Sequence, residues 1–136
     1  MEVSTTEFQL ASYDKPIIVV KATVNDKGPF NFAVDTGASV TVISKRTAEK
    51  LGISNEPSTP KRGQCCGGGI DMSLRRVESV QVGEAEQRNL EVALIDLSSI
   101  SKCLGMELEG VIGHNFMKSY TVIIDYPKKT ISFETA

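Results

Sequence analysis

Cysteine and histidine are scarce in this chain of 136 residues, which has three cysteines and a single histidine, His114. Three cysteines are too few, and odd in number, for a disulfide scaffold. A zinc site would need all of these side chains to converge, and the sequence has neither a Cys-x-x-Cys nor a His-x-x-x-His pair. We therefore expect no metal and no organic cofactor, and the cysteine count mildly favours a reducing compartment.

A basic surplus and long apolar runs are also missing. Fifteen basic side chains stand against 17 acidic ones, a net charge of -2 at pH 7, whereas a nucleic-acid-binding surface normally needs a basic excess. No apolar run approaches the roughly 18 residues of a membrane span, and residues 1–15 lack the apolar stretch of a signal peptide. Neither a nucleic-acid nor a membrane partner is expected, and the sequence leaves the localisation open.

What the chain does contain is a succession of short β-branched segments separated by turn signals, which is typical of an all-β domain. Its length predicts a single domain, residues 1–136, because domains average roughly 150 residues. Residues 16–24 and 30–35, joined by turn residues 25–29, predict a β-hairpin that ends at Asp35. The remaining expected segments are a strand over 39–44, a helix over 45–51 between Ser44 and Gly52, a loop over 55–62, strands over 73–82 and 89–95, a helical turn at 100–104, a short helix at 114–119 and a closing hairpin over 120–133.

The sharpest local pattern is Asp35-Thr36-Gly37-Ala38, which directly follows an apolar strand. A carboxylate at the end of such a strand is expected to be held rigidly and partly removed from water. The glycine lets backbone N–H groups approach the carboxylate where a side chain would interfere. Asp-Thr-Gly is a common tripeptide, so a plain turn closed by an Asx hydrogen bond is the alternative that these residues alone leave open.

The surrounding order of segments makes the pattern more specific. A β-hairpin precedes Asp35-Thr36-Gly37-Ala38, the β-branched run 40–43 follows it, and Val111-Ile112-Gly113 and a short helix come about 75 residues later. This order resembles the retropepsin-like aspartic proteases, in particular the bacterial branch, and is similar to the protease domain of ubiquitin-shuttle proteins. The resemblance extends over roughly residues 17–133 and includes a glycine-rich segment, Cys65-Cys66-Gly67-Gly68-Gly69.

The resemblance implies an all-β acid-protease half-barrel with one or two short helices and a flap hairpin, completed by dimerisation. In this family two Asp-Thr-Gly loops meet on a two-fold axis, their carboxylates share one proton, and the pair activates a water. The sequence has a single Asp-Thr-Gly, so one chain supplies half a site and a homodimeric endopeptidase acting on peptide or protein is implied. The implied catalytic residues are Asp35, Thr36 and Gly37, and the implied substrate contacts are Ala38, Cys66, Gly67, Gly68, Gly69, Val111 and Ile112.

By the same resemblance, Gly37 would donate its backbone N–H to the Asp35 carboxylate, and Thr36 would bond across the dyad. Residues 111–113 would pack behind the Asp35 loop, and apolar side chains including Val34, Val42 and Ile43 would build the cleft walls. From the residues alone, glycines 67–69 fit a mobile flap tip or a plain surface loop.

Two departures from the family pattern affect the expected dimer and site. His114 stands where retroviral members have an arginine that pairs with an acid, so dimer strength would have to come from elsewhere, such as the terminal strand 131–134. A structural hydrogen-bonding role is expected for His114. Ala38 stands where pepsin-like members have a hydroxyl, which predicts a weakly acidic pH optimum. The rival interpretation is a catalytically silent peptide-binding or dimerisation module on the same fold.

Overall fold

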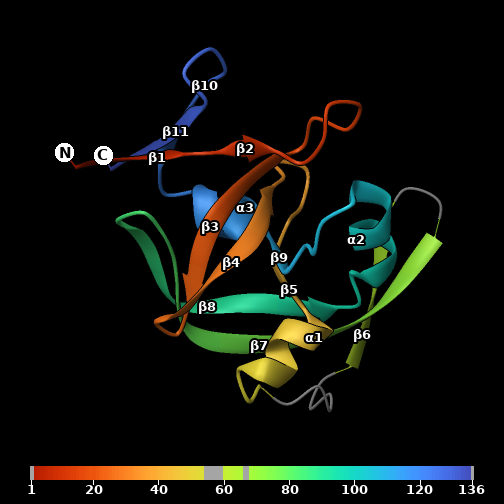
Figure 1. Ribbon diagram of the computed structural model, residues 1–136. Coiled ribbons are helices and arrows are strands. Elements are labelled where there is room, and N and C mark those ends of the chain that lie inside the picture. The colour runs from red at the N-terminus through yellow and green to blue at the C-terminus, as the bar shows by residue number, and fades with distance from the viewer. Residues whose placement is uncertain (1, 54–59, 66–67, 136) are drawn as a thin grey trace.

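The computed structural model describes residues 2–53, 60–65 and 68–135, with the backbone alone for 60–65 and 68–71. It is dominated by strands, as the sequence predicts (Figure 1). The strands are β1 (Val3–Glu7), β2 (Gln9–Leu10), β3 (Ile18–Val24), β4 (Lys27–Val34), β5 (Thr41–Ser44), β6 (Pro60–Cys65), β7 (Gly68–Val82), β8 (Ala85–Ile95), β9 (Gly110–Ile112), β10 (Thr121–Asp125) and β11 (Thr130–Glu134).

The hairpin that leads to Asp35 is formed by β3 and β4. Asn25 and Asp26 both have positive φ, 52° and 64°, which is the backbone of the two-residue turn whose twist matches the flanking strands. Val24 pairs with Lys27 across this turn, the register shifts between Val24 and Ala22, and it then continues from the Ala22–Phe30 pair to Val19 and Ala33. Strand β4 ends at Val34, so the hairpin leads directly into Asp35.

The larger sheet closes into a barrel. Its strand order is β2-β3-β4-β9-β5-β8-β7-β6, and a further pairing of β3 with β7 joins the two sides. The central strand β9 runs parallel to β4 and antiparallel to β5. These pairings place Gly110–Ile112 beside β4, the strand that ends directly before the Asp-Thr-Gly motif.

The β6–β7 hairpin corrects one expectation. Residues 60–62 are the start of β6, not part of a loop over 55–62, and Pro60 pairs with Ser73. The strand order ends at β6, so Pro60 is the first residue of an edge strand, a position at which proline costs no ladder hydrogen bond. Residues 55–59 of the expected loop lie outside the described residues.

Three short helices accompany the strands in the described part of the chain, at the three places where the sequence predicts helical residues, whereas the resemblance implied one or two: α1 (Lys45–Lys50), α2 (Ser98–Leu104) and α3 (His114–Met117). Ser44 caps α1 as the sequence predicts, because its hydroxyl oxygen accepts a hydrogen bond from the N–H of Thr47 at 3.0 Å. Helix α2 begins two residues earlier than expected, where Asp96 Oδ1 accepts a hydrogen bond from the N–H of Ser98 at 2.9 Å. None of the helices in the described residues is long and apolar enough to cross a membrane.

A second, three-stranded sheet joins the two ends of the chain in the order β1-β11-β10 (Figure 1). Strand β11 lies in the middle, paired antiparallel with β1 on one edge and with β10 on the other. Both edges of β11 are thus used within one chain. The expectation that the strand at 131–134 contributes to dimer strength stays a prediction, and any such contribution would not come from a free edge of β11.

The core lies inside the barrel and under the terminal sheet. Phe32, Phe116, Phe133, Ile112 and Ile131 are fully buried there, and burial of each such side chain contributes about 1.5–3 kcal/mol. A smaller apolar cluster fixes α2 to the barrel: Leu97 and Leu104 pack with Val42 and Ala93, and Met72 and Leu74 of β7 border it.

Candidate active site

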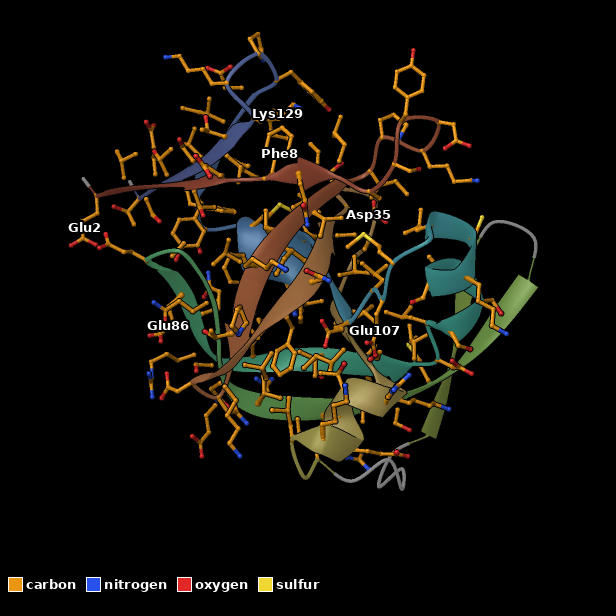
Figure 2. The ribbon with its side chains drawn as sticks, viewed as in Figure 1. Glu2, Phe8, Asp35, Glu86, Glu107 and Lys129 are labelled. Carbon is orange, nitrogen blue, oxygen red and sulfur yellow. The ribbon has the colours of Figure 1, made fainter. Side chains whose placement is uncertain are left out.

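Asp35 is placed by the strand before it. The backbone N–H of Asp35 donates to the carbonyl of Ile112 at 3.0 Å, which extends the parallel pairing of Val34 with Ile112 by one residue. The Asp35 side chain lies on the side of the molecule occupied by α2 and the β2–β3 loop (Figure 2). It is exposed in the single chain, so the expected removal from water is wrong for one chain, since no element among the described residues covers the loop.

The loop that follows is closed by its own backbone. The N–H of Gly37 donates to Asp35 Oδ1 at 2.8 Å, and the N–H of Ala38 donates to the Asp35 carbonyl at 3.2 Å. A Cβ on residue 37 would lie 3.2 Å from Asp35 Oδ1, so glycine allows this close approach. The expected bond from Gly37 to the carboxylate is confirmed. It is also the bond of an Asx turn, so it does not by itself distinguish a protease from a plain turn.

The strand and helix behind the loop hold it in place. The N–H of His114 donates to the carbonyl of Ala38 at 2.7 Å, while the His114 side chain is exposed. A Cβ on Gly113 would lie 2.6 Å from the carbonyl oxygen of Val40, so only glycine fits where the two backbones cross. The packing of residues 111–113 behind the Asp35 loop is confirmed. The hydrogen bond that His114 makes to this loop comes from its backbone N–H.

Two residues that the sequence analysis did not single out complete this support. The buried Thr41 donates both its N–H and its hydroxyl to Asn115 Oδ1, each at 2.8 Å, and accepts from the N–H of Gly113 at 3.1 Å. The amide of Asn115 in turn donates to the carbonyl of Glu91 at 2.7 Å. The sequence signal that could have indicated this support is Asn115 itself, two residues after the glycine of Val111-Ile112-Gly113.

An apolar pocket of about 430 Å³ opens beside Asp35. Its walls come from the start of β3, the end of β4, helix α2, strand β9 and the turn after β10. The lining residues are Pro16, Ile17, Ile18, Ala33, Val34, Asp35, Ile100, Leu104, Leu108, Val111 and Tyr126. Asp35 is the one ionisable carboxyl among them, so a polar reacting group and an apolar recognition surface adjoin each other. The sequence analysis did not predict the contributions of α2 and Tyr126.

The expected cleft residues divide into two groups. Val34 and Val111 are half-buried and line the pocket, whereas Ile43 and Ile112 have 0% exposed surface and belong to the core. Ile112 is therefore placed behind the site, not on its wall, and its burial excludes a direct contact with a peptide in this conformation. Val42 is 7% exposed and packs in the cluster under α2.

The glycine-rich segment lies at the end of the β6–β7 hairpin. Gly68 pairs with Cys65 and Gly69 with Gln64, which confirms a hairpin at this position. Cys66 and Gly67 lie outside the described residues. Cys103 on α2 is an exposed free thiol. No three His, Cys, Asp or Glu side chains gather as metal ligands within the part of the chain that the structure describes.

Comparisons with known proteins agree with this geometry. A family model described as aspartyl protease matches residues 20–116. A retropepsin-like aspartic protease from Rickettsia conorii has a TM-score of 0.69 at 22% identity, covering 97% of this chain and 91% of that chain. The retroviral protease-like domain of Ddi1 from Leishmania major has a TM-score of 0.56 at 19% identity, covering 88% and 94%. Among curated proteins, none matches the chain.

The family match takes in the hairpin before Asp35, the Asp-Thr-Gly-Ala loop and the strand behind it, and the two solved structures share the fold over most of its length. The chain belongs to the aspartyl protease family and has the retropepsin-like fold.

Proposed function

We propose that this protein is an aspartic endopeptidase that acts as a homodimer, with one Asp35 from each protomer. The observation that carries the proposal is the exposed Asp35 carboxylate, held by the Gly37 N–H at 2.8 Å and adjoining an apolar pocket. A plain turn needs no such pocket. An exposed carboxylate on one chain is also what a half-site should look like before a second chain covers it.

The proposed chemistry follows from bringing two such carboxylates together. Like charges about 3 Å apart cannot both ionise, so the pair holds one proton between them. The ionised carboxylate takes a proton from a bound water, which then attacks the peptide carbonyl. The protonated carboxyl donates a hydrogen bond to the carbonyl oxygen as negative charge develops there. Thr36, exposed on the same loop, would bond across the two-fold axis.

The pocket beside Asp35 indicates the class of substrate. Its walls are aliphatic or aromatic, from Ile17, Val34, Ile100, Leu104 and Tyr126, so a large apolar side chain next to the cleaved bond is favoured. We propose that the peptide lies extended, with Ala38 and Val111 on the floor and the end of the β6–β7 hairpin, at Gly68 and Gly69, above.

The decisive test compares two aspartates with the same local geometry. Asp35 and Asp96 each accept a backbone N–H from the residue two positions on, at 2.8 Å and 2.9 Å. Asp35→Asn is expected to abolish cleavage of apolar peptides and keep the fold and the dimer. Asp96→Asn is the matched control and is expected to retain parent turnover. Cleavage is measured with and without a statine-type inhibitor, and association by sedimentation.

The same experiment addresses the silent-module alternative. A parent protein that dimerises and binds peptide but never cleaves it, over the range from acidic to neutral pH, would establish that alternative. Full cleavage by Asp35→Asn would exclude the aspartic mechanism.

A further inference from the structure

Large apolar side chains that remain exposed are concentrated near Asp35. Among the residues whose side chains the structure describes, six are of this kind. Ile17, Ile100 and Tyr126 line the pocket that contains Asp35, and Val3 and Ile123 lie on the terminal sheet. The sixth is Tyr13, which is 103% exposed and lines no part of the pocket. Tyr13 is therefore the one exposed aromatic side chain that neither the fold nor the proposed substrate pocket accounts for in this part of the chain.

The segment that carries Tyr13 is an ordered turn. The N–H of Ala11 donates to the carbonyl of Ile17 at 2.9 Å, and the N–H of Ser12 donates to the carbonyl of Lys15 at 3.2 Å. The Ser12 hydroxyl donates to Asp14 Oδ1 at 3.1 Å and accepts from the N–H of Lys15 at 3.2 Å. An aromatic ring presented by such a turn loses little backbone freedom when it binds, which is the property of an interface anchor.

The position of the turn favours a particular partner. It lies between β2 and β3 and stands out from the barrel on the side of α2 (Figure 1). Its last residue, Ile17, lines the Asp35 pocket together with Pro16. In a two-fold dimer with the two Asp35 residues at the axis, the partner chain comes close to each Asp35 loop. A turn that adjoins the Asp35 pocket is therefore placed near the partner chain.

In the terminal sheet, few strand edges are left to pair with a second chain. Both edges of β11 are paired within one chain, so the terminal sheet offers only the outer edges of β1 and β10. The retroviral arginine-acid pair is also absent, with His114 in its place. Tyrosine is enriched among the residues that contribute most to protein interfaces.

We propose that Tyr13 of each protomer packs against the second copy of this chain, beside the pocket that contains Asp35, and anchors the dimer. This proposal rests on the homodimeric function proposed above. It assigns residues 11–15 of the turn to the partner chain and leaves the adjoining pocket, with Pro16, Ile17 and Tyr126, to the substrate. Tyr13 would thus support catalysis only by bringing the two Asp35 loops together.

The test substitutes Tyr13 and measures dimerisation. Tyr13→Ser is expected to raise the dimer dissociation constant at least about 10-fold, since loss of an aromatic anchor that packs against the partner has effects of that order. Because the side chain is fully exposed, the far-ultraviolet circular dichroism spectrum should stay that of the parent. Tyr13→Phe keeps the ring and is the conservative control. Ile123→Thr, on the outer face of the terminal sheet, tests the competing surface.

Activity as a function of protein concentration provides a second measurement. Tyr13→Ser should lose activity at low concentration and regain parent turnover per dimer at high concentration. A dissociation constant for Tyr13→Ser equal to that of the parent would overturn the proposal, whatever Ile123→Thr does. An unchanged constant with weaker peptide binding would mean that Tyr13 contacts substrate instead. A parent that stays monomeric and inactive at high concentration would refute the proposed function itself, which is a different result.

Discussion

Thr41 and Asn115 are 74 residues apart in the chain and are joined by two hydrogen bonds, from the Thr41 N–H and hydroxyl to Asn115 Oδ1, each at 2.8 Å. Thr41 begins the strand after the Asp35 loop, and Asn115 lies in the helix behind it. With the bond from Asn115 to the Glu91 carbonyl at 2.7 Å, the pair ties three elements together beneath the candidate active site. A neutral hydrogen-bond network thus supports the loop from behind.

Loss of the Thr41 hydroxyl should destabilise the fold. Thr41→Val leaves the buried N–H of Gly113 without its acceptor and removes one donor to Asn115. An unsatisfied buried polar group costs about 1–3 kcal/mol, and we expect a decrease of that size in the free energy of unfolding measured in urea. Thr41→Ser keeps the hydroxyl and should lose less. Equal stability of the valine and serine variants would contradict the role assigned to this bond.

Gly113→Ala should lower turnover by more than its loss of stability explains. Its Cβ would lie 2.6 Å from the Val40 carbonyl oxygen and 3.0 Å from that of Ala38, so the Asp35 loop must move, at about 1–3 kcal/mol. Gly105→Ala is the control and should lose a similar amount of stability. Its backbone has φ 70°, which costs an alanine about 1–2 kcal/mol, although no atom lies within 4 Å of the added Cβ. Turnover measured well below both melting temperatures should fall only in Gly113→Ala.

Gly68→Val should depress turnover more than it lowers thermal stability. Gly68 pairs with Cys65 at the last described position of the β6–β7 hairpin, where a closing flap would meet the substrate. Valine suits a strand, so the hairpin itself should tolerate it. Gly63→Val, in the same hairpin opposite Ile70, is the control and should change turnover less. The same kinetics in the parent and Gly68→Val would leave this hairpin without a flap function.

Ala38→Ser should shift the pH–rate profile toward lower pH. A hydroxyl directly after Gly37 could donate to the carboxylate pair, which favours the ionised form. Because the two carboxylates titrate together, the measurement is the profile of the dimer on an uncharged peptide. Ser39→Ala alters a hydroxyl one residue further on and should leave the profile unchanged. A parent optimum as acidic as that of pepsin-like enzymes would contradict the prediction.

Asp96 should make the stability of the protein depend on pH. The hydrogen bond from the Ser98 N–H at 2.9 Å holds the pKa of Asp96 below its usual value of 3.8. A carboxyl with a lowered folded-state pKa stabilises the fold above its unfolded value, and this stabilisation is lost as the pH falls through the folded value. Asp96→Ala should therefore unfold earlier than the parent in urea at pH 6, and the difference should shrink below about pH 3.8. A difference that persists unchanged at the lowest pH would show that the charge of Asp96 has no part in it.

Local rules were sufficient for much of this protein. The turn at Asn25 and Asp26, the Ser44 cap and the glycine at position 37 depend on residues a few positions apart, so the sequence by itself determined the hairpin, the first helix and the Asp35 loop. The order of the motifs along the chain also indicated the family, because each segment carries its own pattern.

Only the tertiary structure decided which distant residues meet at the site. It buried Ile112 in the core and left Val111 on the pocket wall, brought Ile100 and Tyr126 next to Asp35, and joined Thr41 to Asn115. Strand pairing explains these outcomes: successive side chains in a strand point to opposite faces, so the register of β9 between β4 and β5 sets which of two neighbouring aliphatics is buried. Strand pairing in the three-stranded sheet likewise filled both edges of β11, and the fold left Tyr13 fully exposed on the turn between β2 and β3.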